Sequence, residues 1–213
     1  MAAESSGLTA SLALVSFALV AAVHAGFVVW LFRARLLSRP LSRPAQRFVL
    51  ALLATVAWAL MGLLDLQSTK MLTWHLTWLL DQLRYAAWAA FGLALLQPAG
   101  AHTRPWAWRG AGLPAAAFAA GLAANLYLGF VDEGSALALR LLLASQLAWA
   151  VLGIVLVEQL FRNQTESSRW AAKPLCLGLG CIFVYDVYLF AQALMFGSFD
   201  ADALSARLSL IHI

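Results

Sequence analysis

The stretch RWAAKPLCLGLGCIFVYDVYLFAQALM, Arg169–Met195, decides the fold of this chain. It opens with basic and aromatic residues and continues as a long apolar run with one carboxylate, Asp186, near its middle. A helix of about 20 apolar residues is long enough to cross a bilayer. A carboxylate at the centre of such a helix costs about 3 kcal/mol on insertion scales, so Asp186 is expected to have a partner or a task inside the membrane.

The composition of the whole chain agrees with this interpretation. Of its 213 residues, 63% are hydrophobic and 11% are charged, whereas soluble domains carry about 25% charged residues. We therefore expect an all-α fold, a polytopic transmembrane helix bundle that forms one domain over residues 1–213. The predicted spans are six complete ones and a truncated seventh, at residues 8–32, 46–66, 73–96, 111–131, 136–161, 174–196 and 204–213.

The distribution of charge predicts the orientation of the bundle. Ten of the fourteen Lys and Arg residues fall in the three connections after the first, third and fifth spans, and the other connections are mostly acidic. The positive-inside rule then places the N-terminus outside the cell. The net charge of +4 is too small and too dispersed to indicate binding to nucleic acid. The sixth span should begin at Pro174, because proline is tolerated in the first turn of a helix.

The third span is the second polar one. Asp81 and Arg84 stand three residues apart and can pair along one helix face. An aromatic stripe shares that face, with members about 3.5 residues apart, at Trp74, Trp78, Asp81, Tyr85 and Trp88. A packing seam with one local ion pair explains this pattern, and so does a cleft that senses a ligand or signal.

Depth connects the two polar spans. Arg84 and Asp186 each lie about eleven residues, or about 16 Å, below the same outer surface. We predict that Asp186 faces Arg84, that Asp81 shares the guanidinium, and that Tyr185 and Tyr188 flank the cluster. The cluster is either a structural clamp or a latch that responds to pH or to a ligand. Small residues on the Asp186 face of the sixth span, Gly178 and Ala193, would allow close helix approach.

A family resemblance adds a functional expectation. Several short motifs resemble the membrane domain of the PrsK sensor histidine kinases. They are Phe161-Arg162-Asn163, Arg169-Trp170, Lys173, the Leu175–Gly178 run and Tyr185-Asp186 with Tyr188. These kinases belong to the PEP-CTERM/exosortase (XrtA) system of Gram-negative bacteria. The segment DQLRYAAW, Asp81–Trp88, resembles the third span of the same family. The likeness covers about 30 residues as motif and the rest as topology.

The resemblance implies a signal-input region of a two-component system in the bacterial inner membrane. The regulated genes would be those for exopolysaccharide and PEP-CTERM protein sorting, with a homodimer and a cognate response regulator as partners. ATP and Mg belong to the kinase domain, which this chain lacks, so no cofactor and no catalytic residue are expected here. Arg162, Asn163, Arg169, Trp170 and Lys173 form the expected inner-interface motif. The final letters, residues 208–213, resemble a translated sequencing adapter, so the chain is expected to be a fragment with a non-native tail.

Other functions stay open at this point. A small receptor or transporter that stands alone is the main alternative, although no internal repeat indicates an inverted-repeat transporter. A membrane-embedded enzyme would need a nucleophile, metal or phosphate-binding motif, and the sequence contains neither GxSxG, HExxH nor a phosphate loop. No spacing of His and Cys residues predicts a metal site. A structural membrane subunit is also compatible with the sequence.

Overall fold

The computed structural model describes residues 2–34, 41–68, 70–96, 105–163 and 166–197, with the backbone alone described in 2–10, 105–111, 166–169 and 171. The predicted segment 204–213 and the proposed tail 208–213 lie outside these ranges. The described chain is helical throughout and contains no strand. Its six helices are α1 (Ala2–Arg33), α2 (Arg43–Gln67), α3 (Met71–Leu96), α4 (Pro105–Phe130), α5 (Ala136–Arg162) and α6 (Glu166–Phe196).

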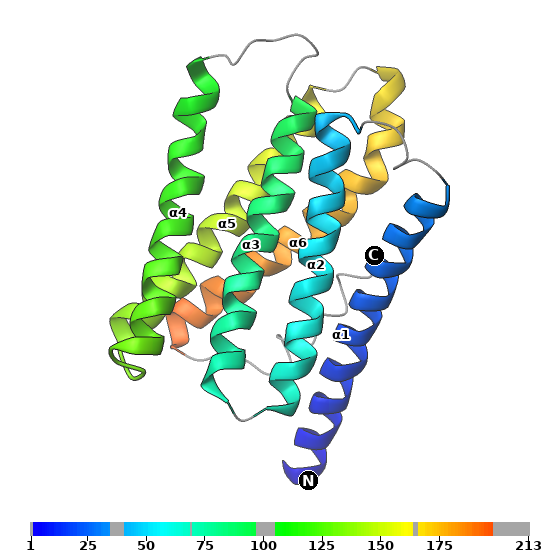
Figure 1. The fold of residues 1–213 in the computed structure, drawn as a ribbon. Helices are drawn as coiled ribbons and strands as arrows, with labels where there is room; N and C mark the ends of the chain where they lie inside the picture. The colour runs from blue at the N-terminus through cyan, green and yellow to red at the C-terminus, as the bar shows by residue number, and fades with distance from the viewer. Residues whose placement is uncertain (1, 35–40, 69, 97–104, 164–165, 198–213) are drawn as a thin grey trace.

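The six helices alternate in direction along one bundle (Figure 1). Helix α3 is central, because its backbone packs against α2, α4 and α5. Helix α1 packs on α2, and α6 packs on α5. Within the described chain, the backbone of α6 makes no comparable approach to α1, α2 or α3. Side chains therefore have to fill the space between α6 and the first three helices.

In the described part of the chain, five helical segments are long and apolar enough to cross a membrane, which indicates a multi-pass membrane protein. They are Ser11–Arg33, Arg43–Gln67, Gly112–Phe130, Ala136–Arg162 and Ala172–Phe196. Helix α3 has 26 residues and a similar length, but Asp81, Gln82 and Arg84 lower its average apolarity. All three are buried, with at most 4% of each residue exposed, so the polar groups of α3 point into the bundle. A count of six spans is a prediction that depends on α3.

The bounds of α6 correct one expectation. The helix begins at Glu166, so Pro174 lies inside it rather than in its first turn. The basic residues Arg169 and Lys173 are likewise part of the helix and do not belong to a loop. An apolar span from Ala172 still fits the sixth predicted span.

Short connections at the acidic end of the bundle have clear sequence causes. The Ser135 side chain accepts a hydrogen bond from the Ala138 N–H (3.4 Å) and caps the start of α5. Just before it, the Asp132 carboxylate accepts from the Gly134 N–H at 3.0 Å. The α2–α3 turn is held by the Thr73 hydroxyl, which donates to Asp65 at 2.8 Å. These contacts fix the helix ends that set the register of α3 against α4 and α5.

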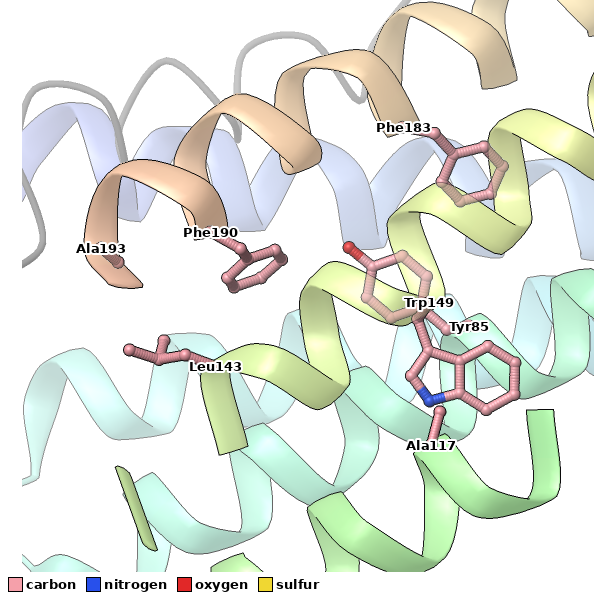
Figure 2. Close-up of a cluster of buried hydrophobic side chains, with 7 residues drawn as sticks. All are labelled: Tyr85, Ala117, Leu143, Trp149, Phe183, Phe190 and Ala193. Atoms are coloured by element: carbon pink, nitrogen blue, oxygen red, sulfur yellow. The ribbon is translucent and has the colours of Figure 1, made fainter. Parts of the chain in front are cut away.

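The interior contains aromatic clusters that position the polar groups. The largest, shown in Figure 2, joins α3, α4, α5 and α6 through Tyr85, Ala117, Leu143, Trp149, Phe183, Phe190 and Ala193. A second cluster joins α1 and α2 around Val20 and Trp58, and Ile182 of α6 packs against it. Side chains of α6 thus reach both clusters while its backbone follows α5.

Candidate functional site

The ion pair predicted from the spacing of Asp81 and Arg84 is present. The Arg84 Nε and Nη2 donate to the same Asp81 oxygen, Oδ1, at 2.9 and 2.6 Å. Both side chains are at most 5% exposed. Two donors on one carboxylate oxygen give a charge-assisted bond in a water-poor environment, where it is strong. The prediction of an i, i+3 pair on α3 is confirmed.

Arg84 is also enclosed by aromatic rings. Its guanidinium carbon lies 4.4 Å from the centre of the Trp58 ring on α2 and 4.7 Å from that of Tyr85 on α3. A cation over the face of a desolvated aromatic ring gains up to about 2 kcal/mol. These contacts turn Arg84 toward α2 and fix it against the neighbouring residue of its own helix.

Asp186 meets α3 through Tyr85. The Tyr85 hydroxyl donates a hydrogen bond to Asp186 Oδ2, and Asp186 is fully buried at 0% exposure. Figure 2 shows the Tyr85 hydroxyl pointing toward α6, with Phe183 and Phe190 on either side. The ring of Tyr85 stacks on Phe183, with centroids 6.1 Å apart. A link between α3 and α6 therefore exists, and Tyr85 is the residue that bridges it.

Asp186 and Arg84, which were expected to face each other, are connected through Tyr85. The guanidinium of Arg84 rests on the Tyr85 ring, and the hydroxyl of that ring binds Asp186. A shared guanidinium between Asp81 and Asp186 stays a prediction. We call Asp81, Arg84, Tyr85 and Asp186 the polar link.

The two tyrosines next to Asp186 point elsewhere. Tyr188 is 55% exposed and lies on the outside of α6. Tyr185 is half-buried, and its ring lies 5.9 Å from that of Tyr188. Residues one or two positions apart on a helix do not share a face, which explains why neither lies in the polar link with Asp186.

Further polar contacts join the helices around the polar link. Gln82 Nε2 donates to Ser145 Oγ on α5 at 3.2 Å, and Trp88 Nε1 donates to Thr55 Oγ1 on α2 at 3.1 Å. Tyr85 falls in the aromatic stripe predicted from the sequence, but nothing in its spacing marks it as the partner of Asp186. Its position beside Arg84, at the predicted depth, was the only sequence signal for that role.

Nearer the acidic end, α3 and α4 are joined by a two-way contact. His75 Nδ1 and Asn125 Oδ1 lie 2.8 Å apart, and Asn125 Nδ2 donates to the His75 carbonyl at 3.1 Å. Gly129 leaves room for the imidazole, because a Cβ there would lie 3.2 Å from His75 Nε2. This pair is a packing contact of the bundle and lies apart from the polar link in sequence and on the helix.

The predicted inner-interface motif divides into separate local contacts. Arg162 pairs with Glu158 at 3.0 Å on the exposed end of α5, and Asn163 caps that helix by donating to the Gln159 carbonyl at 2.7 Å. The Lys173 Nζ lies 4.8 Å from the centre of the exposed Trp170 ring. The Arg169 side chain lies outside the described residues. These features suit an interface between helix ends and lipid headgroups.

The small-residue face of α6 borders a cavity. Gly178 and Ile182 line a space of about 170 Å³ that also touches Arg84, Tyr85 and Trp88 of α3. Gly178 was expected to bring another helix close, but here it borders open volume. Among the described residues, no group of three or more His, Cys, Asp or Glu side chains is gathered in a way that could hold a metal ion.

The polar link therefore combines two carboxylates, one guanidinium and one phenol at the junction of α2, α3 and α6. No protein-family model, curated protein or solved structure matches this chain.

Proposed function

We propose that this chain is the membrane-embedded input region of a sensor histidine kinase similar to PrsK. In this proposal it lies in the bacterial inner membrane with its N-terminus outside, as a homodimer of bundles with six complete spans. A kinase domain beyond the described residues would use ATP and Mg and pass phosphate to a cognate response regulator. The regulated genes would be those for exopolysaccharide and PEP-CTERM protein sorting.

The observation that carries the proposal is the hydrogen bond from Tyr85 to the buried Asp186. Because α5 is the only described helix on which α6 packs its backbone, this bond is a main polar attachment of α6 to α3. If α6 moved along α5, the hydrogen bond between Tyr85 and Asp186 would be strained or broken. A switch requires an element with two discrete arrangements whose balance an input can bias. In this proposal the polar link is that element, and α6 would pass its movement to the predicted seventh segment.

A structural clamp is the competing interpretation of the same geometry. Buried ion pairs fix register in some proteins without any role in signalling. A stand-alone receptor or small transporter is the alternative function, and the cavity beside Arg84 favours a receptor within that class. The structural clamp and the stand-alone receptor each predict other results than the kinase proposal in the two experiments that follow.

The first experiment is to read the parent gene past Arg207 from independent DNA. A frame that continues into a dimerisation helix with a phospho-accepting histidine and an ATP-binding domain supports the proposal. A frame that stops after a complete seventh span overturns the kinase assignment and favours the stand-alone receptor.

The second experiment measures autophosphorylation of the full-length protein in lipid nanodiscs. Asp186→Asn and Tyr85→Phe should each shift the level of autophosphorylation at equal amounts of inserted protein. Tyr188→Phe is the matched control, because it removes a hydroxyl two positions away on the exposed side of α6. Variants that lose insertion but keep normal activity per inserted molecule would identify a structural clamp.

A further inference from the structure

The cavity beside the polar link lies between four helices. It has a volume of about 170 Å³ and is bordered by residues from α1, α2, α3 and α6, including His24, Thr55, Arg84, Trp88, Gly178 and Ile182. Apolar cavities of about 150 Å³ accept a benzene-sized ring. The volume therefore suits one ring or a head group of similar size.

Some hydrogen-bonding groups of the cavity wall already have partners, whereas Arg84 keeps a donor for a ligand. The Thr55 hydroxyl donates to the Ala51 carbonyl at 2.8 Å and accepts from Trp88 at 3.1 Å. The hydroxyl of Thr55 and the indole N–H of Trp88 are therefore already hydrogen-bonded. Arg84 uses Nε and Nη2 on Asp81. The hydrogen bonds of Arg84 to other described residues do not involve its Nη1. A guanidinium has five N–H donors, so Arg84 can still donate to a ligand oxygen in this cavity.

Charge selects among possible acceptors. Asp81 already pairs with the guanidinium of Arg84, and the carboxylate of Asp186 binds the Tyr85 ring on which that guanidinium rests; all three side chains are buried. A ligand carboxylate or phosphate would add another negative charge inside the membrane, where unpaired charges are costly. A neutral oxygen, such as a carbonyl, gains the hydrogen bond without that cost.

A second hollow borders α1 and adjoins the cavity at His24. It is lined by apolar residues around Gly26, shares His24 with the cavity, and has a volume of about 460 Å³. A Cβ placed on Gly26 would have no atom within 4 Å, so the glycine leaves this groove open. Its other walls include Phe27 and Trp30, which are 39% and 55% exposed. This groove suits a hydrocarbon tail.

We propose that the cavity and the groove together bind a neutral amphiphile with a ring-sized, carbonyl-bearing head and an apolar tail, which is the chemistry of a lipid-soluble quinone. A head carbonyl accepts from Arg84 Nη1, and the tail follows α1 past Gly26. This inference rests on the proposed function where it names the signal that the polar link reads. Arg84 stacks on Tyr85, so a ligand on Arg84 acts one residue from the bond to Asp186.

The test is binding of a soluble quinone by the purified full chain in detergent micelles, measured by titration calorimetry. The probe is decylubiquinone. Decylbenzene has a ring and the same tail but no carbonyl, and decanoate has a tail with a charged head. Saturable one-to-one binding of decylubiquinone, at least tenfold tighter than either comparator, is the expected result.

Two matched variants locate the site. Gly26→Leu should weaken decylubiquinone binding at least fivefold because it fills the groove. Gly112→Leu on α4 should leave the affinity unchanged, and it has the same open surroundings, with no atom within 4 Å of an added Cβ. Arg84→Lys keeps a positive charge for Asp81 but removes the planar fork, and it should also weaken binding.

Three results would overturn the inference. They are equal binding of decylbenzene, tightest binding of decanoate, and equal effects of the two glycine variants. Because the titration contains no kinase readout, it can fail while the autophosphorylation shift stands. Conversely, quinone binding with unchanged autophosphorylation of Tyr85→Phe would reject the signalling proposal alone.

Discussion

The Tyr85–Asp186 hydrogen bond gives the sharpest test of how α6 is held. Tyr85→Phe removes one hydroxyl and keeps the ring, which is 2% exposed and stacked on Phe183. The packing should therefore survive, and Asp186 loses a donor while it stays fully buried. Hydrogen bonds to charged groups contribute about 1.5–3 kcal/mol in protein interiors. Interhelical bonds inside membranes average about 0.6 and reach about 1.7 kcal/mol. We expect Tyr85→Phe to lower the free energy of unfolding by about 1–2 kcal/mol.

A double-mutant cycle isolates this bond from other effects of the substitution. In an Asp186→Leu background the Tyr85 hydroxyl has lost its carboxylate acceptor, so Tyr85→Phe should change stability by less than about 0.5 kcal/mol. The measurement is reversible unfolding of the purified chain in mixed lipid–detergent micelles, followed by circular dichroism against the denaturing detergent fraction. Tyr188→Phe, on the exposed face of α6, serves as the control with an expected effect near zero.

The reasoning fails if Tyr85→Phe costs the same in both backgrounds. Additivity would mean that the hydroxyl contributes through some other contact and that α6 is held by packing alone. An equal loss for Tyr85→Phe and Tyr188→Phe would also reject it. A coupling energy of about 1–2 kcal/mol between positions 85 and 186 would establish the bond.

Two further substitutions test the packing and the surface. Gly153→Ala should lower stability by about 1–3 kcal/mol, because its Cβ would overlap the Phe183 ring, whereas Gly180→Ala meets only an ordinary contact at 3.9 Å and should be neutral or slightly stabilising. The same micelle unfolding assay compares them, and equal effects would contradict the close α5–α6 approach at Gly153. Glu158→Gln should change stability by less than about 0.5 kcal/mol, since the side chains of Arg162 and Glu158 are 69% and 55% exposed. A loss above about 1 kcal/mol in that assay would show that this pair belongs to a larger network.

The all-helical class and the local pairs follow from the sequence because they depend on short-range patterns, whereas the number of spans and the orientation stay predictions. Asp81 and Arg84 pair because residues three apart are neighbours on any helix. Glu158 and Arg162 pair for the same reason at four residues. The start of α6 was harder to predict, since Pro174 is compatible with both a first turn and a helix interior. The start of α6 depends on whether the residues before Pro174 adopt a helical conformation.

The residue of α3 that contacts Asp186 could not be identified from sequence periodicity and depth. The depth argument pointed to Arg84, whose neighbour Tyr85 is the residue that bonds Asp186, and adjacent residues on a helix point about 100° apart. Which of Arg84 and Tyr85 faces α6 is set by the rotation of α3 against α2. Trp58 stacks on the guanidinium from α2 and draws Arg84 to that side.

That rotation has a consequence for the chemistry of the site. With Arg84 turned toward α2, Asp186 receives a hydrogen bond from the neutral phenol of Tyr85. A neutral donor can adapt to a change in its acceptor at low cost, whereas a direct ion pair inside the bilayer would lock α6 in place. In the proposed function, the Tyr85 bridge is the contact that moves. Replacing it by a direct pair, through Tyr85→Arg with Arg84→Tyr, should stiffen the α3–α6 contact and raise the free energy of unfolding while abolishing any input-dependent shift in autophosphorylation. A swapped protein that still responds to its input would show that signalling does not pass through this contact.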